Sequence, residues 1–239
     1  MCGRYALNSE LFEVQQAFKV DEQPQWAARY NITPTQPAFI VHRQSQERTG
    51  QLVRWGFVPS WAKDPAAMSL IINARSETLE EKPSFRAAYK HRRCLVPATG
   101  FYEWQRSGKT KTPYWVPPAG GGLIAFAGIW ETWSDAAGTE MDTMAILTTE
   151  ANATLAAIHH RQPVVIHPDQ FDAWLGIDPV SPSELKEMTR PAPDDFFAPV
   201  RVGERINKAI HDDADLQKPL STEDIAKADA AVQEQFSLF

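Results

Sequence analysis

The sequence has 239 residues, of which 43% are hydrophobic and 23% charged, and its formal net charge is −6. This balance is typical of a soluble globular chain, and the lack of an export signal, or of any run near the roughly 18 apolar residues of a membrane span, predicts a cytoplasmic protein without a membrane partner. Two cysteines, Cys2 and Cys94, are too few for a disulfide framework or a four-cysteine zinc site, and we predict no metal and no cofactor.

The charge is unevenly distributed along the chain. Residues 1–112 hold 16 Lys and Arg against 10 Asp and Glu, whereas residues 113–239 hold 8 against 20. Chance scatter would explain this difference, but a basic first half also suits contact with DNA phosphates.

The first predicted element is a helix that begins after Ser9. Its apolar residues are spaced to bury one face: Leu11, Phe12, Val14 and Phe18. Runs of β-branched and aromatic residues then predict strands over residues 38–42, 51–58, 93–97, 99–105, 113–116, 123–131 and 143–148. Further helices are expected over residues 78–90, 151–158, 168–175 and 181–189.

These elements predict an α+β fold. We expect one domain over residues 1–211, with a β-rich, mostly antiparallel and barrel-like core flanked by helices. Residues 212–239 are acidic and rich in alanine, which predicts a flexible tail.

Cys2 is the first candidate for chemistry. Removal of Met1 would place a free α-amine beside its thiol, and an α-amine with an ordinary pKa of about 7.7–8.0 is neutral far more often than lysine at pH 7. Such an amine condenses with an aldehyde, and the thiol then adds to the imine and closes a thiazolidine ring. The alternative is an inert thiol at a frayed end.

Glu103 lies in the apolar segment 94–104. In a strand it would share a face with Phe101, and burial would raise its pKa and suit it to proton transfer. An exposed carboxylate on an edge strand is the alternative. Trp104 fits either a place in the core or stacking on a base.

Two further segments combine polar residues with apolar runs. His159 and His160 follow a predicted helix; one of them could transfer protons, since adjacent histidines do not readily converge on one metal ion. Asn73 and Arg75 follow an apolar strand and could bind a hydroxyl and a phosphate, although a capped turn explains the same residues.

Six motifs taken together resemble the SOS response-associated peptidase (SRAP) family over roughly residues 1–210. They are Met1-Cys-Gly-Arg-Tyr5, Arg29-Tyr-Asn-Ile-Thr-Pro34, Trp55-Gly-Phe-Val-Pro59, Asn73–Thr78, Pro97–Trp104 and His159–Pro163. The resemblance implies a sensor of abasic sites in single-stranded DNA that crosslinks itself through Cys2 to the ring-opened sugar. It also implies autocatalytic removal of Met1 and slow release of the link by the reverse reaction. An imine intermediate could itself promote β-elimination, which predicts a weak lyase activity.

The resemblance assigns roles to individual residues. Cys2 is the nucleophile, Asn73 binds the sugar, Glu103 transfers protons and His159 assists formation of the imine. DNA contacts are implied for Arg4, Asn31, Trp61, Arg75, Trp104, Thr148 and Arg161. Gln162 departs from the family pattern, which often has methionine or arginine at that position. We expect a monomer.

The last five residues, Gln235-Phe-Ser-Leu-Phe239, resemble the short peptide by which bacterial repair proteins bind the β sliding clamp. Gln235 would form hydrogen bonds while Leu238 and Phe239 fill an apolar pocket. Because five-residue motifs recur by chance, an end that folds back onto the core is the alternative.

Two other functions remain open. One is a thiol or N-terminal-nucleophile peptidase that acts on other proteins, in which Cys2 attacks the peptide carbonyl and Glu103 or His159 is the base. The other alternative is a protein that binds single-stranded DNA without a covalent bond and uses only its arginines and tryptophans to do so.

Overall fold

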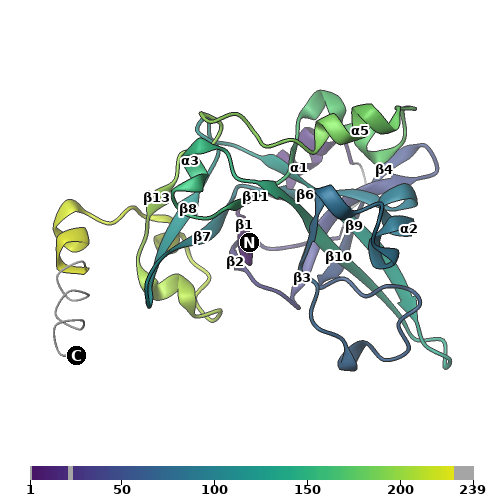
Figure 1. The fold of residues 1–239 in the computed structure, drawn as a ribbon, viewed down its shortest axis with the longest axis horizontal. Helices are drawn as coiled ribbons and strands as arrows, with labels where there is room; N and C mark the ends of the chain where they lie inside the picture. Colours follow the sequence, from purple (N-terminus) through teal and green to yellow (C-terminus); the bar gives the residue numbers. More distant parts are fainter. Residues whose placement is uncertain (1, 21–23, 229–239) are drawn as a thin grey trace.

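The computed structural model describes residues 2–20 and 24–228, and its strands form two sheets (Figure 1). The first sheet consists of β1 (Arg4–Leu7), β2 (Arg29–Ile32), β7 (Gly100–Ser107), β8 (Thr110–Val116) and β13 (Val200–Arg201), in the order β13-β8-β7-β1-β2. The second sheet contains β3 (Pro37–Gln44), β4 (Glu47–Trp55), β5 (Asn73–Arg75), β6 (Arg93–Ala98), β9 (Ile124–Ser134), β10 (Glu140–Glu150), β11 (Arg161–Pro163) and β12 (Val165–Ile166).

Helices lie around the sheets (Figure 1). The α-helices are α1 (Leu11–Phe18), α2 (Pro83–His91), α3 (Ala153–Ala156), α4 (Phe171–Leu175) and α5 (Pro182–Met188). The 3-10 turns are η1 (Pro65–Ala67), η2 (Ser76–Thr78), η3 (Pro168–Gln170), η4 (Glu204–Asn207) and η5 (Ala214–Gln217). Helices α2 and α4 pack on β6, and α5 packs against α4.

The inner faces of the two sheets share one hydrophobic core. Tyr5 of the first sheet meets Trp55 of the second edge to face, with ring centroids 5.2 Å apart, and Phe101 meets Phe126 in the same way at 6.0 Å. The strand pairings are antiparallel except for those of β10 with β4 and β5. The predicted α+β fold with a mostly antiparallel, barrel-like core is confirmed.

The predicted strands overlap observed ones, but their ends differ. The strand predicted over 51–58 ends at Trp55, because the next residue, Gly56, has a φ of 143° and leaves the strand conformation. A side chain would not fit at this position, since a Cβ on Gly56 would lie 2.6 Å from Cδ1 of Leu70. The sequence did not predict β1, β2, β5, β11, β12 or β13. These strands have two to four residues each, and their hydrogen bonds come from partners distant in the sequence.

The first helix differs from its prediction in two ways. Its N-cap is Glu10, and the side chain of Glu13 accepts a hydrogen bond from the Glu10 N–H. Val14 and Phe18 are buried, but Phe12 is 63% exposed. Burial of Phe12 is therefore a wrong prediction, because a residue two positions before Val14 points to the opposite side of the helix.

The chain after residue 203 packs on the outer face of the first sheet. Ile206 and Leu216 are buried there in a small second core with Tyr102 and Trp115. The segment expected to begin the tail at residue 212 therefore starts in contact with the domain. The predicted clamp motif at 235–239 lies outside the described residues.

The described residues, 2–20 and 24–228, show neither a membrane-spanning helix nor a metal-binding cluster. No helix there is long and apolar enough to cross a bilayer. Residues 2–20 and 24–228 also contain no group of three or more His, Cys, Asp or Glu side chains arranged to hold a metal ion.

Candidate active site

Cys2 lies just before β1, where the two sheets meet. It is fully buried, and its thiol donates to the backbone carbonyl of Arg4 with an Sγ to oxygen distance of 3.7 Å. From the second sheet, Nδ2 of Asn73 donates to the backbone carbonyl of Cys2 at 2.9 Å. Asn73 therefore holds the main chain that carries the candidate nucleophile.

The surroundings of Cys2 keep its thiol protonated. Burial, and after it the negative charge of Glu103, raise the pKa of the Cys2 thiol well above its ordinary value. Thiol peptidases depend on a lowered cysteine pKa that yields the thiolate at neutral pH. The Cys2 thiol therefore needs a neighbouring base before it can attack.

Glu103 lies on the inner face of β7, as the alternation along the strand predicts. Like Phe101 it is buried, being 5% exposed, and its Oε1 accepts from the N–H of Trp104 at 3.1 Å. Its charge influences the pKa values of both Cys2 and His159. A carboxylate in electrostatic reach of both groups is suited to move protons between them.

His159 lies in the loop between α3 and β11. Its Nδ1 lies 3.0 Å from the N–H of Arg161 and 3.3 Å from the Arg161 carbonyl, so the main chain of Arg161 holds the ring on this side. Burial lowers the pKa of His159, and the charge of Glu103 opposes this effect. The ring is therefore mostly neutral at pH 7 and able to accept a proton.

A groove of about 630 Å³ opens beside His159. It is lined by Trp104, Gln105, Arg106, Ser107 and residues 156–160. His160 is exposed and stacks on His159, with ring centroids 4.3 Å apart. A polymer lying in this groove would reach the histidine loop on one side and the end of β7 on the other.

Arg161 secures the His159 loop from inside the protein. It is 7% exposed, and its guanidinium donates to both carboxylate oxygens of Glu77, at 2.6 and 2.8 Å, and to the backbone carbonyl of Thr148 at 2.5 Å. Hydrogen bonds from Arg161 lower the pKa of Glu77. Thr148 is also buried, so the DNA contacts expected of Arg161 and Thr148 stay predictions that their burial does not favour.

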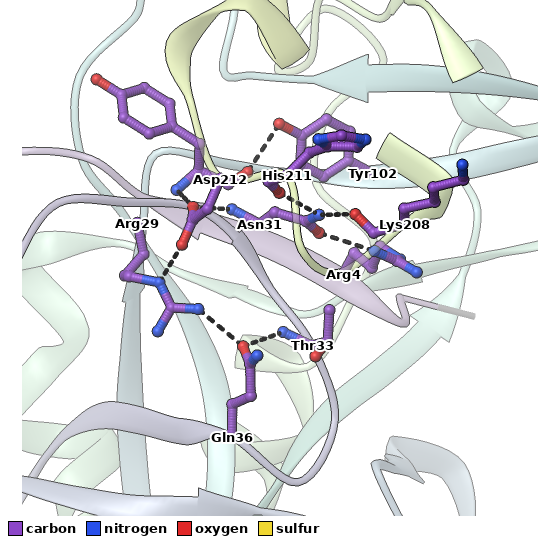
Figure 2. A network of polar contacts seen from close by, with 10 residues as sticks. Arg4, Arg29, Asn31, Thr33, Gln36, Tyr102, Lys208, His211 and Asp212 are labelled. Carbon is purple, nitrogen blue, oxygen red and sulfur yellow. Dashed lines mark hydrogen bonds and ion pairs between the residues drawn. The ribbon is translucent and has the colours of Figure 1, made fainter. Parts of the chain in front are cut away.

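A second polar cluster surrounds Asn31 (Figure 2). Asn31 is fully buried; its Oδ1 accepts from Arg4 at 3.0 Å, and its Nδ2 donates to the carbonyls of His211 at 2.8 Å and Lys208 at 3.3 Å. The amide of Asn31 is engaged inside the protein and positions Arg4, and the DNA contact expected of Asn31 stays a prediction.

Asp212 completes this cluster. Its carboxylate accepts from the N–H groups of Tyr30 at 2.5 Å and Asn31 at 2.9 Å, and from the guanidinium of Arg29 (Figure 2). These charge-assisted bonds fasten the end of the domain to β2.

Asn207 joins Arg4 to Trp104. Its carbonyl accepts from Arg4 at 2.8 Å, and its Oδ1 accepts from Nε1 of Trp104 at 2.9 Å. The Arg4 guanidinium also lies 5.9 Å from the centre of the Trp104 ring. Two predicted DNA contacts are thus held in one arrangement beside Cys2.

The remaining predicted contacts lie apart from this cluster. Trp61 is 60% exposed in the loop between β4 and β5, and Arg75 is exposed at the end of β5. Among the described residues, no hydrogen bond or ring contact joins Trp61 to the other predicted site residues.

Sequence reasoning missed Asn207 and Asp212. Their hydrogen-bond partners lie about 100 to 200 residues earlier in the chain. The short 3-10 turn that ends at Asn207 has no periodic pattern of apolar residues from which its position could be predicted. Only the folded arrangement reveals their contacts.

Comparisons with known proteins identify the family and the fold of the chain. The family described as SOS response associated peptidase (SRAP) matches residues 1–209. The abasic site processing protein YoqW of Bacillus subtilis is 36% identical over 221 residues, covering 90% of this chain and 98% of the relative. The abasic site processing protein HMCES of Gallus gallus is 32% identical, covering 84% and 73%. A crystal structure of a protein from Bacteroides thetaiotaomicron has the same fold, with a TM-score of 0.77 and 24% identity over 92% of this chain and all of that one.

Proposed function

Because the chain belongs to the SOS response associated peptidase (SRAP) family, we propose that it processes abasic sites in DNA by bonding covalently to them through Cys2. The observation that carries the proposal is the placement of Cys2 beside Asn73 and within electrostatic reach of Glu103, which also acts on His159. Relatives of this chain are abasic site processing proteins, and an abasic site presents an aldehyde when its sugar ring opens.

The reaction begins with hydrolysis of the peptide bond between Met1 and Cys2, which consumes one water, releases methionine and frees the α-amine of Cys2. The amine adds to C1′ of the opened sugar and gives a carbinolamine, which loses one water to form an imine. The thiol sulfur then adds to the imine carbon, and the thiol proton passes to the nitrogen. One aldehyde and one aminothiol thus give one thiazolidine and one water, without any oxidant or reductant.

The neighbouring residues supply positioning and proton transfer. Asn73 fixes the Cys2 main chain, and its own Oδ1 is buried without a hydrogen-bond partner among the described residues, so it can accept from a sugar hydroxyl. Glu103 and neutral His159 take the thiol proton and return protons to the carbinolamine. The raised pKa of the Cys2 thiol makes this help necessary.

Single-stranded DNA is the proposed substrate. A buried nucleophile must receive an extrahelical sugar, and an unpaired strand presents it without the few kcal/mol of unstacking and unpairing that a duplex requires. Arg4 and Trp104 lie beside Cys2 and can contact a phosphate and a base. The thiazolidine would shield the lesion, while the imine that precedes it permits a weak lyase reaction.

The experiment on the substrate compares three forms of one single-stranded oligonucleotide. The protein should form an adduct that survives heating in denaturant with the abasic form only. The intact form should give none, and neither should the abasic form after borohydride has reduced its aldehyde to an alcohol. Equal adducts with intact or reduced DNA would contradict the aldehyde mechanism. Cleavage of a supplied peptide without any adduct would favour a peptidase.

We also propose that the last five residues bind the β sliding clamp and bring the protein to replication forks. Purified clamp should retain the parent chain but not a variant carrying Leu238→Ala and Phe239→Ala, because these side chains would fill the apolar pocket of the clamp. Val232→Ala, in the same acidic segment, is the matched control. Equal retention of all three chains would disprove the clamp assignment.

A further inference from the structure

Residues 207–211, which we call the arm, lie at the edge of the proposed DNA site. Asn207 contacts Arg4 and Trp104, and the carbonyls of Lys208 and His211 face Asn31 (Figure 2). The main chain of the arm is thus fixed at both ends. Trp104 lines the groove beside His159 and also donates to Asn207, so one indole ring contacts both the groove and the arm.

The exposed side of the arm combines a cation with an apolar group. Ile210 is 85% exposed, the highest exposure among the large hydrophobic residues that the structure describes. Lys208 is exposed too, and no ion pair involves it within residues 2–20 and 24–228. Two nearby acids pair with other cations, Asp212 with Arg29 and Asp213 with Arg205, while Glu204 is exposed in the preceding turn. Lys208 and Arg4 therefore present positive charge at one edge.

We propose that the arm is a DNA-binding element in which Lys208 pairs with a phosphate and Ile210 packs against the base or sugar beside the lesion. A lysine next to an exposed apolar side chain suits a single strand, whose charged backbone alternates with unstacked bases. The hydrogen bonds that hold the main chain of the arm keep both side chains close to Arg4 and Trp104. The inference rests on the proposed function and adds the residues that hold the strand.

The test measures binding of intact single-stranded DNA by fluorescence anisotropy, so that it does not depend on the covalent step. Lys208→Ala should weaken binding and reduce the slope of log K against log salt by about 0.7, the value for one phosphate contact on a single strand. Ile210→Ala should weaken binding with the slope unchanged. The double variant should lose roughly tenfold in affinity. Lys208→Arg should restore the slope.

Controls come from exposed residues elsewhere on the domain. Lys90→Ala removes a lysine on α2, and Phe12→Ala removes an exposed apolar side chain on α1. Both should bind DNA as the parent does. Parental affinity and slope in the Lys208 and Ile210 double variant, or an equal loss in Lys90→Ala, would overturn the assignment. A parent protein that binds DNA but never forms an adduct would refute the covalent proposal and leave this measurement valid.

Discussion

Replacing Cys2 with serine should reduce the heat-stable adduct with abasic single-stranded DNA by roughly 10³-fold or more, because the variant loses the sulfur that closes the ring. The adduct is measured on a denaturing gel after a fixed reaction time. The variant should bind intact DNA as the parent does, since Arg4, Trp104 and the arm are unchanged.

The serine variant also separates the two bonds of the proposed reaction. It keeps the α-amine, so it should still form the imine, which is reversible and disappears on heating. Addition of borohydride during the reaction should reduce that imine to a stable amine and restore an adduct in the variant. An adduct that forms without borohydride in the serine variant would show that the thiol is not needed.

Cys94 provides a matched control for this substitution. It is the other cysteine of the chain, is also fully buried, and burial raises the pKa of its thiol as well. Its sulfur packs in the core, where a Cβ on Gly128 would lie 2.7 Å from it. Cys94→Ala should cost some thermal stability and leave the adduct yield unchanged. Loss of the adduct in both variants would point to a general effect on folding.

The parts of the site that could be predicted from sequence depend on local patterns. Alternation along residues 99–105 placed Phe101 and Glu103 on one face, and β7 buries both. Asn73 was singled out because it follows an apolar run, and His159 because it follows a predicted helix and matches the family motif. The chemistry of Cys2 followed from its position beside Met1 and needed no fold.

The parts that could not be predicted depend on contacts between distant segments. Asn31 was expected to touch DNA, yet its amide holds the carbonyls of Lys208 and His211, nearly 180 residues later. Arg161 was expected to reach the DNA; its buried guanidinium pairs with the exposed carboxylate of Glu77, and the DNA contact stays a prediction. In both cases a buried polar side chain near the site has hydrogen-bond partners within the protein, and sequence alone does not distinguish this role from ligand binding.

Replacing Glu103 with glutamine should slow formation of the adduct about 10²-fold or more, the usual contribution of general acid–base catalysis, while the final adduct stays the same. Glutamine has nearly the same shape and can still accept from the N–H of Trp104. It cannot transfer a proton. A time course at a DNA concentration that saturates the parent measures the rate separately from the yield.

The charge of Glu103 gives this prediction a definite sign. That charge raises the pKa of the Cys2 thiol, so its removal should make the thiolate easier to form. If Glu103 acted only through its charge, the glutamine variant would react faster than the parent. If Glu103 carries protons, the variant reacts more slowly in spite of the more acidic thiol. Glu103→Asp, which keeps the carboxylate, should recover part of the rate.

Glu131 is the matched control for Glu103. It is a buried glutamate on β9, 6% exposed, and its Oε1 accepts from the N–H of the next residue, Thr132, at 3.1 Å, the geometry that Glu103 has with Trp104. Its carboxylate pairs with Arg92, away from Cys2. Glu131→Gln should lower the melting temperature without slowing the adduct in the folded protein. A Glu103→Gln variant that reacts at the parental rate would remove Glu103 from the mechanism and leave His159 as the only proton acceptor proposed for the Cys2 thiol.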